Sequence, residues 1–260
     1  MNYGLYLSAS GVLSNTYRQD VFANNLANAQ TVGFKVDIPS IKQRDTASME
    51  DQLGYMFSKD MLDKLGGGVL AGMQLTQHDR GQFKQTDNPF DMALDEAKTY
   101  FAVQIPDRNG QPAIELTRDG RFTRDSQGFL ATITGGHKLL GTDDAPIQLP
   151  ATGDILVQSD GRILVDGEEI SRLQITGVKD VNHLIKRGQN LYGMPSQDDN
   201  FRQIAPRASV MQGFIEQSSV DPIKTLMQLT EATKAANSNA NMIKYQDQLL
   251  DRAINTLGRV

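Results

Sequence analysis

The residues with the clearest capacity for metal or acid–base chemistry are three histidines that lie far apart in the chain. His78, His137 and His183 fall in turn-like stretches, and no two of them have the i, i+4 spacing of a zinc-binding helix. The chain contains no cysteine, which excludes disulfides and thiolate metal sites. The sequence therefore predicts neither a metal nor any other cofactor.

The carboxylates give no stronger sign of catalysis. Asp154 with Asp160, or Glu168 with Glu169, could form acid–base pairs, but solvated hairpin ends explain them better because carboxylates are rarely buried without a partner. The glycine triplet 66–68 has no Gly-Lys-Ser/Thr after it, so it is not a phosphate loop. Neither a nucleophile elbow nor a dinucleotide fingerprint is present. We expect a protein that is not an enzyme.

Length and charge narrow the remaining classes. The chain has 260 residues, 39% hydrophobic and 22% charged, with a net charge of -5 and a pI of about 5.2. There is no basic footprint for nucleic acid, and no apolar run approaches the ~18 residues that predict a membrane-spanning helix. The stretch Met1–Leu5 lacks a basic segment followed by an apolar one, so we expect no cleaved signal peptide.

The last forty residues predict one very long helix. Asp221 is a suitable N-cap and Pro222 suits the first helical position, and no further Gly or Pro follows until Gly258. Such a helix would be about 55 Å long at 1.5 Å per residue. Half of its heptad-like seam is small or polar. This fits an imperfect two-stranded coiled coil, a long helix at a domain edge, or a helix that needs several neighbours in a repeating assembly. The seam consists of Ile223, Leu226, Thr230, Thr233, Asn237, Ala240, Ile243, Asp247, Leu250, Ile254 and Leu257.

Residues 3–28 predict a second helix of the same character. Its seam is again long and diluted by small and polar residues, and Gly11 in its interior weakens it. Two such helices at opposite ends of the chain predict that the termini pair with each other. The seam consists of Leu5, Ala9, Val12, Thr16, Gln19, Ala23 and Leu26.

The stretch Asn24–Lys35 predicts a chain reversal after this helix. Asn and Gly tolerate the left-handed backbone that ends a helix, and Phe34 could pack back to fix the turn. The composition alone also fits an ordinary Asn-rich helix end. Beyond it, residues 36–80 read as a linker whose Met and Phe side chains between Met49 and Leu65 could line a short amphipathic helix, either as a flexible joint or as a docking face.

Residues 81–217 predict antiparallel β structure. Short alternating runs are separated by turn signals such as Asp119-Gly120, Asp160-Gly161, Asp166-Gly167 and Gln127-Gly128. Regular short strands with such turns indicate a small barrel or sandwich.

Several stretches resemble the bacterial flagellar rod and hook family of axial proteins. Asn24-Asn25-Leu26-Ala27-Asn28 followed by Thr31, Gly33, Phe34 and Lys35 is similar to that family's N-terminal signature. Three further stretches match its motifs around the β domain and before the C-terminal helix: 88–94, 116–130 and 213–220. The chain departs from the family pattern at Glu96–Phe101 and at Lys234, where an aromatic residue is expected.

The resemblance implies a rod-type subunit, proximal or distal, of α+β fold with a discontinuous helical layer. The implied parts are the helix and signature turn 1–35, the linker and subunit-contact segment 36–80, the β domain 81–217 and the C-terminal helix 218–260. The implied partners are further copies of the chain, other rod or hook proteins and the flagellar export apparatus, with no nucleic acid and no membrane insertion. The implied location is the periplasm-spanning rod of the basal body.

The resemblance and the seams together define a set of expected subunit-interface residues. The alternatives are a hook-type or other axial subunit, or a soluble β-domain binding module on a coiled-coil dimerisation stalk, which would use a cleaner Leu/Ile seam. The expected interface residues are Leu5, Val12, Asn24, Asn25, Leu26, Asn28, Thr31, Gly33, Phe34, Ile223, Leu226, Asn237, Ala240, Ile243, Leu250, Ile254 and Leu257.

Overall fold

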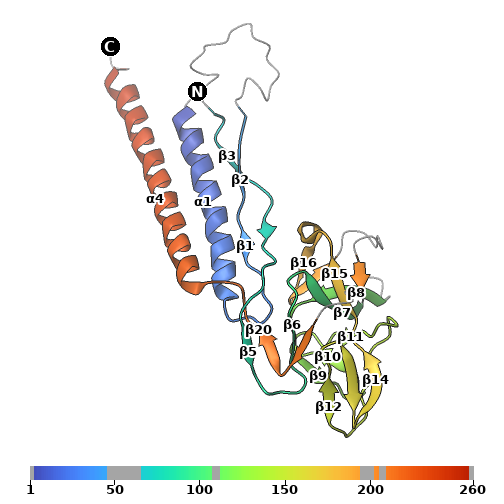
Figure 1. The fold of residues 1–260 in the computed structure, drawn as a ribbon. Coiled ribbons are helices and arrows are strands. Elements are labelled where there is room, and N and C mark those ends of the chain that lie inside the picture. The colour runs from blue at the N-terminus through green and yellow to red at the C-terminus, as the bar shows by residue number, and fades with distance from the viewer. Residues whose placement is uncertain (1–2, 46–65, 107–111, 194–201, 205–208, 258–260) are drawn as a thin grey trace. The chain divides into compact units, whose positions relative to one another are not determined.

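The computed structural model describes residues 3–45, 66–106, 112–193, 202–204 and 209–257 (Figure 1). Its contacts group the chain into two compact units. The helical unit comprises Met1–Ala27, Asp37–Leu75 and Asp221–Val260, and the β unit comprises Asn28–Val36 and Thr76–Val220. Residues 28–35 of the signature stretch therefore group with the β unit, and most of the expected linker groups with the helices.

Two long helices dominate the helical unit. Helix α1 spans Tyr3–Ala27, and α4 spans Pro222–Arg252 before a π-helical turn, η2, at Ala253–Leu257. The expected cap of α4 is confirmed, because the Asp221 carboxylate accepts hydrogen bonds from the backbone N–H groups of Ile223 and Lys224. No described helix combines the length and apolarity needed to cross a membrane.

Small residues allow α1 and α4 to lie antiparallel and close together (Figure 1). The Gln19 amide donates to the Ala232 carbonyl at 3.3 Å. A Cβ on Gly11 would lie 2.4 Å from the amide nitrogen of Asn239. Gly11, which weakens the helix in isolation, therefore makes room for an α4 side chain.

The segment after the signature turn forms an extended arm instead of a plain linker. Its strands are β1 (Asp37–Ile38), β2 (Ile41–Gln43), β3 (Val69–Ala71) and β4 (Leu75–Thr76). Strand β2 pairs antiparallel with β3, and β1 pairs with β4. The amphipathic helix expected between Met49 and Leu65 lies outside the described residues.

The main sheet of the β unit is antiparallel and has the order β16-β17-β8-β7-β11-β10-β9, with β15 joining β7 and β18 joining β15. A second sheet has the order β12-β13-β14, and β19-β6 and β20-β5 form two further short antiparallel pairs. Over the described residues the strands do not close into the barrel that the sequence allowed. The bounds are β5 Phe83–Gln85, β6 Met92–Leu94, β7 Thr99–Pro106, β8 Pro112–Thr117, β9 Phe122–Arg124, β10 Leu130–Thr132, β11 Lys138–Leu139, β12 Ile155–Val157, β13 Arg162–Val165, β14 Glu168–Arg172, β15 Ile175–Val178, η1 Val181–His183, β16 Ile185–Gly188, β17 Leu191–Gly193, β18 Arg202–Ile204, β19 Val210–Gln212 and β20 Phe214–Glu216.

Strand β7 is buried on both faces and organises the hydrophobic core. Phe101 and Val103 point into the larger apolar cluster, with Leu139 and Ile163. Tyr100 and Ala102 point into a second cluster on the opposite face. This follows from the alternation of side chains along a strand.

Most of the predicted turns form, and one does not. Asp166-Gly167 closes the β13–β14 hairpin with both residues at positive φ, 52° and 90°. Asp119-Gly120 is not a hairpin turn, because β8 and β9 do not pair with each other. A Cβ on Gly120 would lie 1.6 Å from the Met92 carbonyl oxygen, so this glycine permits a close backbone approach instead.

Candidate functional site

Residues 28–35 of the signature stretch belong to the β unit and form a turn with hydrogen bonds between its own backbone groups. The Thr31 N–H donates to the Asn28 carbonyl at 3.1 Å, and the Phe34 N–H donates to the Thr31 carbonyl at 3.3 Å. Phe34 is buried as expected, and the Lys186 ammonium lies 4.1 Å from the centre of its ring. The turn is therefore more than a helix end, since its side chains pack into the β unit.

Gly33 allows the closest approach in this turn. Its φ of +71° is a conformation that L side chains rarely adopt. A Cβ there would lie 2.5 Å from the carbonyl oxygen of Arg118. Its N–H donates to the Glu216 carbonyl at 2.8 Å. Both the backbone angle and the neighbouring chain therefore require glycine.

Three charged side chains near the contacts of Gly33 form a buried group. We call this group the anchor cluster, and it consists of Lys35, Arg118 and Glu216. The Lys35 Nζ donates to Glu216 Oε1 at 2.6 Å and to the Asp79 carbonyl at 2.7 Å. Arg118 Nε lies 2.9 Å from Glu216 Oε2 as an ion pair, not aligned as a hydrogen bond. The side chains of all three are at most 2% exposed.

Further contacts fix each member of the anchor cluster. The Gly81 N–H donates to Glu216 Oε1 at 2.7 Å. Arg118 Nη1 donates to the carbonyls of Thr99 at 2.6 Å and Glu96 at 2.8 Å. A buried carboxylate and two buried cations are thus held by backbone groups as well as by one another.

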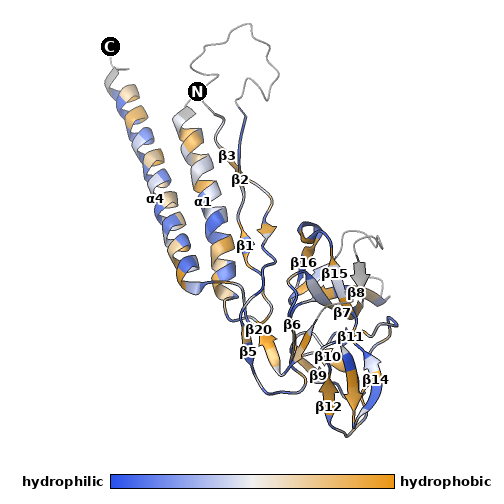
Figure 2. Ribbon diagram, viewed as in Figure 1, coloured by the Kyte–Doolittle hydropathy of each residue, from blue (hydrophilic) through white to orange (hydrophobic). Residues whose placement is uncertain are grey.

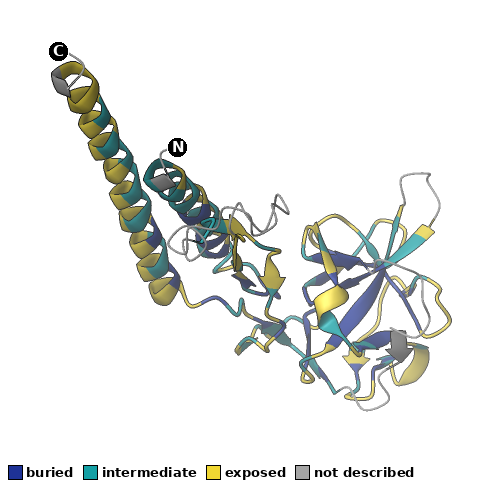
Figure 3. Ribbon diagram, turned by 90° about the horizontal axis from the view of Figure 1, so that it is seen from above, coloured by how far each residue is buried: buried dark blue, intermediate teal, exposed yellow. Residues whose placement is uncertain are grey.

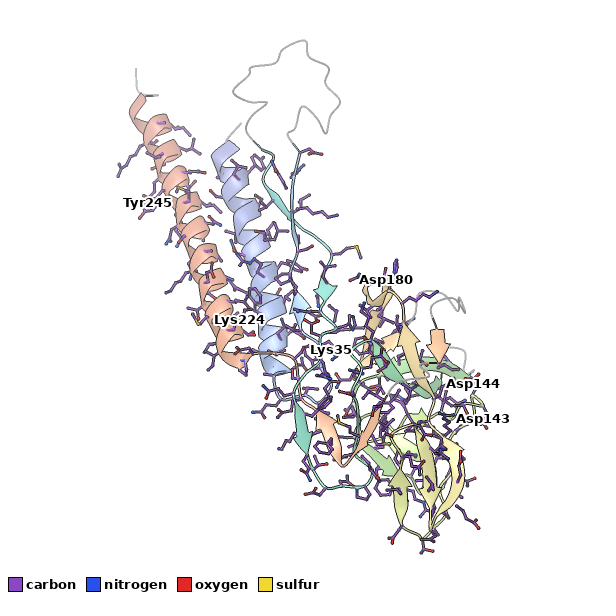
Figure 4. The ribbon with its side chains drawn as sticks, viewed as in Figure 1. Lys35, Asp143, Asp144, Asp180, Lys224 and Tyr245 are labelled. Atoms are coloured by element: carbon purple, nitrogen blue, oxygen red, sulfur yellow. The ribbon has the colours of Figure 1, made fainter. Side chains whose placement is uncertain are left out.

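Burial shifts the pKa of Lys35 in the anchor cluster and the pKa of the neighbouring Tyr100. Desolvation lowers the pKa of Lys35 despite the opposing effect of Glu216. Desolvation also raises the pKa of the neighbouring Tyr100 hydroxyl, which is hydrogen-bonded to His78 Nδ1 at 2.6 Å. Arg118 lies 5.7 Å from the centre of the Tyr100 ring. Figure 4 labels Lys35 in this region.

Asn25 has a separate role within the helical unit. Its side-chain amide donates to the Asp37 carbonyl at 2.7 Å, and its oxygen accepts from the Asp37 N–H at 2.9 Å. Asn25 is 1% exposed. This two-point contact satisfies the backbone of β1 beside the end of α1, which a side chain without both donor and acceptor could not do.

The second functional feature is the outward face of α4. Of the described α4 side chains, Thr225 and Ala232 are the buried ones. Helix α4 also carries exposed apolar side chains mixed with polar ones. Figure 2 shows apolar and polar residues alternating along its ribbon, and Figure 3 shows much of it as exposed. Tyr245 and Lys224 on α4 are labelled in Figure 4. The exposed apolar residues are Ile223, Leu226, Met227, Met242, Tyr245, Leu249 and, in η2, Ile254.

The predicted interface residues divide into three groups. Gly33, Phe34 and Asn25 are buried in the chain itself, and Leu5, Val12, Leu26, Asn28, Thr31, Ala240, Ile243 and Leu250 are partly buried. Asn24, Ile223, Leu226, Asn237 and Ile254 are exposed, and the side chain of Leu257 lies outside the described ones. Because successive residues turn by 100°, the predicted α4 seam rotates about half a turn between Ile223 and Leu250. Ile223 and Leu226 are therefore exposed, whereas Ile243 and Leu250 are partly buried on the side toward α1.

Arg118 and Glu216 were not predicted as site residues. Each lies in a stretch that carried the family resemblance, and Lys35 ends the N-terminal signature. The pairing of Lys35 with Glu216 could not be predicted from sequence spacing, since the two residues are 181 positions apart. The available signal was one charged residue in each of three motif stretches.

Two families of known proteins match stretches near the two ends of the chain. Residues 5–35 match the family described as "Flagella basal body rod protein", and residues 211–256 match "Flagellar basal body rod FlgEFG protein C-terminal". The chain is 31% identical to the flagellar basal-body rod protein FlgF of Rhizobium meliloti, over 99% of both chains. It is 30% identical to FlgF of Caulobacter vibrioides over the full length of both, and 29% identical to FlgG of Buchnera aphidicola over 95% and 97% of the two chains.

These full-length similarities define the class of protein as structural. The chain belongs to the family of flagellar basal-body rod proteins. It is a structural subunit of the bacterial flagellar basal body and serves motility. The matched stretch 5–35 includes α1, the signature turn and Lys35, and the matched stretch 211–256 includes Glu216 and α4.

Proposed function

We propose that this subunit assembles through α1 and α4 with further copies of itself and with other rod or hook axial proteins. The observation that carries the proposal is the exposed apolar face of α4. Ile223 is 75% exposed, Met227 68% and Tyr245 63%. Apolar side chains gathered on one face of a helix favour a contact with another protein.

The length of α4 supports the same conclusion. Along its 31 residues, its described buried side chains are one threonine and one alanine. Most helical stability in proteins comes from packing of an apolar face, so a second packing surface would stabilise α4. Asn237 and Asn241 on the exposed side offer donors and acceptors to a neighbouring helix.

The role we propose is mechanical. Packed end helices would form the wall of a periplasm-spanning tube that transmits torque and leaves a central channel, and the subunit would reach it through the flagellar export apparatus. FlgF and FlgG relatives align over 97 to 100% of their own length. This supports a rod-type subunit, because a hook subunit is expected to carry a further outer domain.

Sedimentation at increasing protein concentration tests the proposal. The wild-type chain should form polymers that grow with concentration, and Leu226→Asp should raise the concentration needed at least about tenfold, corresponding to about 1.4 kcal/mol. The matched control is Leu156→Asp on β12, since Leu156 is 55% exposed and Leu226 53%. A fixed dimer at all concentrations would support the dimerisation stalk instead. Equal effects of the two substitutions on the concentration needed for polymers would show that α4 is not the assembly face.

A further inference from the structure

The anchor cluster joins every stretch of the β unit that leads to the helical unit. Lys35 lies one residue before the chain leaves the β unit at Val36, and Asp79 and Gly81 follow its return at Thr76. Glu216 lies four residues before the final exit at Val220. Lys35 Nζ and Glu216 Oε1 contact each other and the backbone of this returning stretch.

Backbone hydrogen bonds reinforce the same three stretches. The Gly33 N–H donates to the Glu216 carbonyl at 2.8 Å, and the Ser219 N–H donates to the Phe34 carbonyl at 3.0 Å. The Val36 N–H donates to Ser219 Oγ at 3.0 Å, and the Gln77 N–H donates to the Val36 carbonyl at 2.9 Å. The entering and leaving chains are thus bonded to each other inside the β unit.

A buried ion cluster is a poor source of net stability compared with apolar side chains of similar size, because desolvation of the charges offsets their attraction. It is, however, directional. A carboxylate that accepts from Lys35, pairs with Arg118 and accepts from the Gly81 backbone fixes one arrangement of those groups. The contribution expected from such a cluster is therefore a defined geometry.

We infer that the anchor cluster is a clamp that fixes where the chain leaves the β unit toward α1, the arm and α4, and that Glu216 is a positioning residue for assembly. The inference rests on the proposed assembly through the end helices. When the clamp opens, α4 starts from an undefined position and the subunit is not competent to assemble. The apparent affinity of the subunit for a growing polymer is then the intrinsic affinity multiplied by the fraction of subunits whose clamp is closed.

The first test compares Glu216→Gln with Asp95→Asn in the full-length chain. Asp95 pairs with Arg80 at the surface, where their side chains are 53% and 48% exposed, so it is a matched control for losing an ion pair. Both variants are assayed at a temperature where circular dichroism shows a fully folded β unit. Glu216→Gln should raise the concentration needed for polymers at least about tenfold, a competent fraction near one tenth. Wild-type polymerisation by Glu216→Gln would overturn the inference.

The second test asks whether position is what Glu216 supplies. The chain has no cysteine, so Val36→Cys with Ser219→Cys introduces one possible disulfide between the entering and leaving chains. In the Glu216→Gln background, the oxidised protein should form polymers at a concentration within about twofold of the wild-type value. The reduced protein should still need the raised concentration expected for Glu216→Gln alone. Failure to form the disulfide contradicts the proximity, and failure of the disulfide to restore assembly contradicts the positioning role.

Amide hydrogen exchange separates this inference from the proposed function. The N–H groups of Gly33 and Ser219 should be protected in the wild type and should lose protection together in Glu216→Gln. If the wild type does not polymerise, the assembly proposal is wrong while the exchange result still decides whether the clamp exists. Unchanged protection of both amides in Glu216→Gln would show that the anchor cluster does not act as a clamp.

Discussion

The β unit and the helical unit bury their side chains in opposite ways. Strand β7 sends Phe101 into one apolar cluster and Tyr100 into another, and both are at most 1% exposed. Helix α4 is far longer, yet its described buried side chains are Thr225 and Ala232. The β unit thus contains its own core, whereas the described buried side chains of α4 are only one small polar and one small apolar residue. The difference indicates that the β unit is stable by itself and that the helical unit depends more on neighbours.

The largest effect should come from the core of the β unit. Phe101→Ala removes a side chain that packs edge-to-face on Phe122 with ring centres 5.2 Å apart. We expect a loss of about 3–5 kcal/mol in the free energy of unfolding, measured by denaturant titration. Thr225→Ala, at one of the two described buried positions of α4, should leave this transition unchanged. Similar losses from both substitutions would show that the two units unfold together.

Gly33→Ala should have the next largest effect, again on the β unit. The positive φ costs about 1 kcal/mol for alanine, and the clash with the Arg118 backbone adds an overpacking cost of about 1–3 kcal/mol. Gly136→Ala is the matched control, because its φ is +64° but no atom lies within 4 Å of the added Cβ. Equal losses from the two substitutions would mean that the turn relaxes without cost. This expectation differs from that for a turn that only orients a helix, which would leave the β unit unaltered.

Ile243→Asp should act on the helical unit alone. Ile243 is partly buried on the α1 side of α4, so the carboxylate should weaken helix pairing by about 1–3 kcal/mol. Helical circular dichroism should fall at a lower temperature, while the β unit's transition should stay in place. The adjacent Met242→Asp is the control, since Met242 is 52% exposed. A larger effect of Met242→Asp on the isolated subunit would reverse the assignment of the two α4 faces.

The smallest effect concerns alkaline pH. Because burial raises the pKa of Tyr100, the unfolded chain loses this proton near pH 10 while the folded chain keeps it. Stability should therefore fall as pH rises above 10, by up to about 1.4 kcal/mol per pH unit. Tyr100→Phe should be slightly less stable at pH 8, through the lost bond to His78, and should close that gap by pH 11. Parallel stability curves from pH 8 to 11 would contradict the raised pKa.

The sequence predicted the elements better than their contacts. Asp221-Pro222 marked the start of α4, and Asp166-Gly167 marked a hairpin, because caps and turns depend on local chemistry. None of the four strands of the arm was predicted, as β2 and β3 illustrate. Each has three residues and little apolar alternation, so only their pairing reveals them.

The candidate site could be predicted only in part. Gly33 and Phe34 stood out because a turn requires a permissive backbone and an apolar side chain. The pairing of Lys35 with Glu216 joins distant parts of the sequence, and no periodicity carries that information. The predicted α4 seam does not stay on one side of the helix, since a pattern of threes and fours on a straight helix gradually changes faces. Its role as a subunit interface stays a prediction.

The hydrogen bond between Gly33 and Glu216 also bears on how such a chain could change over evolution. The long intervening stretch begins and ends at bonded neighbours, so it is a closed loop with fixed ends. Lengthening a closed loop costs little entropy, about 0.6 kcal/mol per doubling, and exposed turns away from the closure tolerate insertions best. Related chains could therefore replace, lengthen or shorten this central stretch while the bonded positions at its two ends stayed the same.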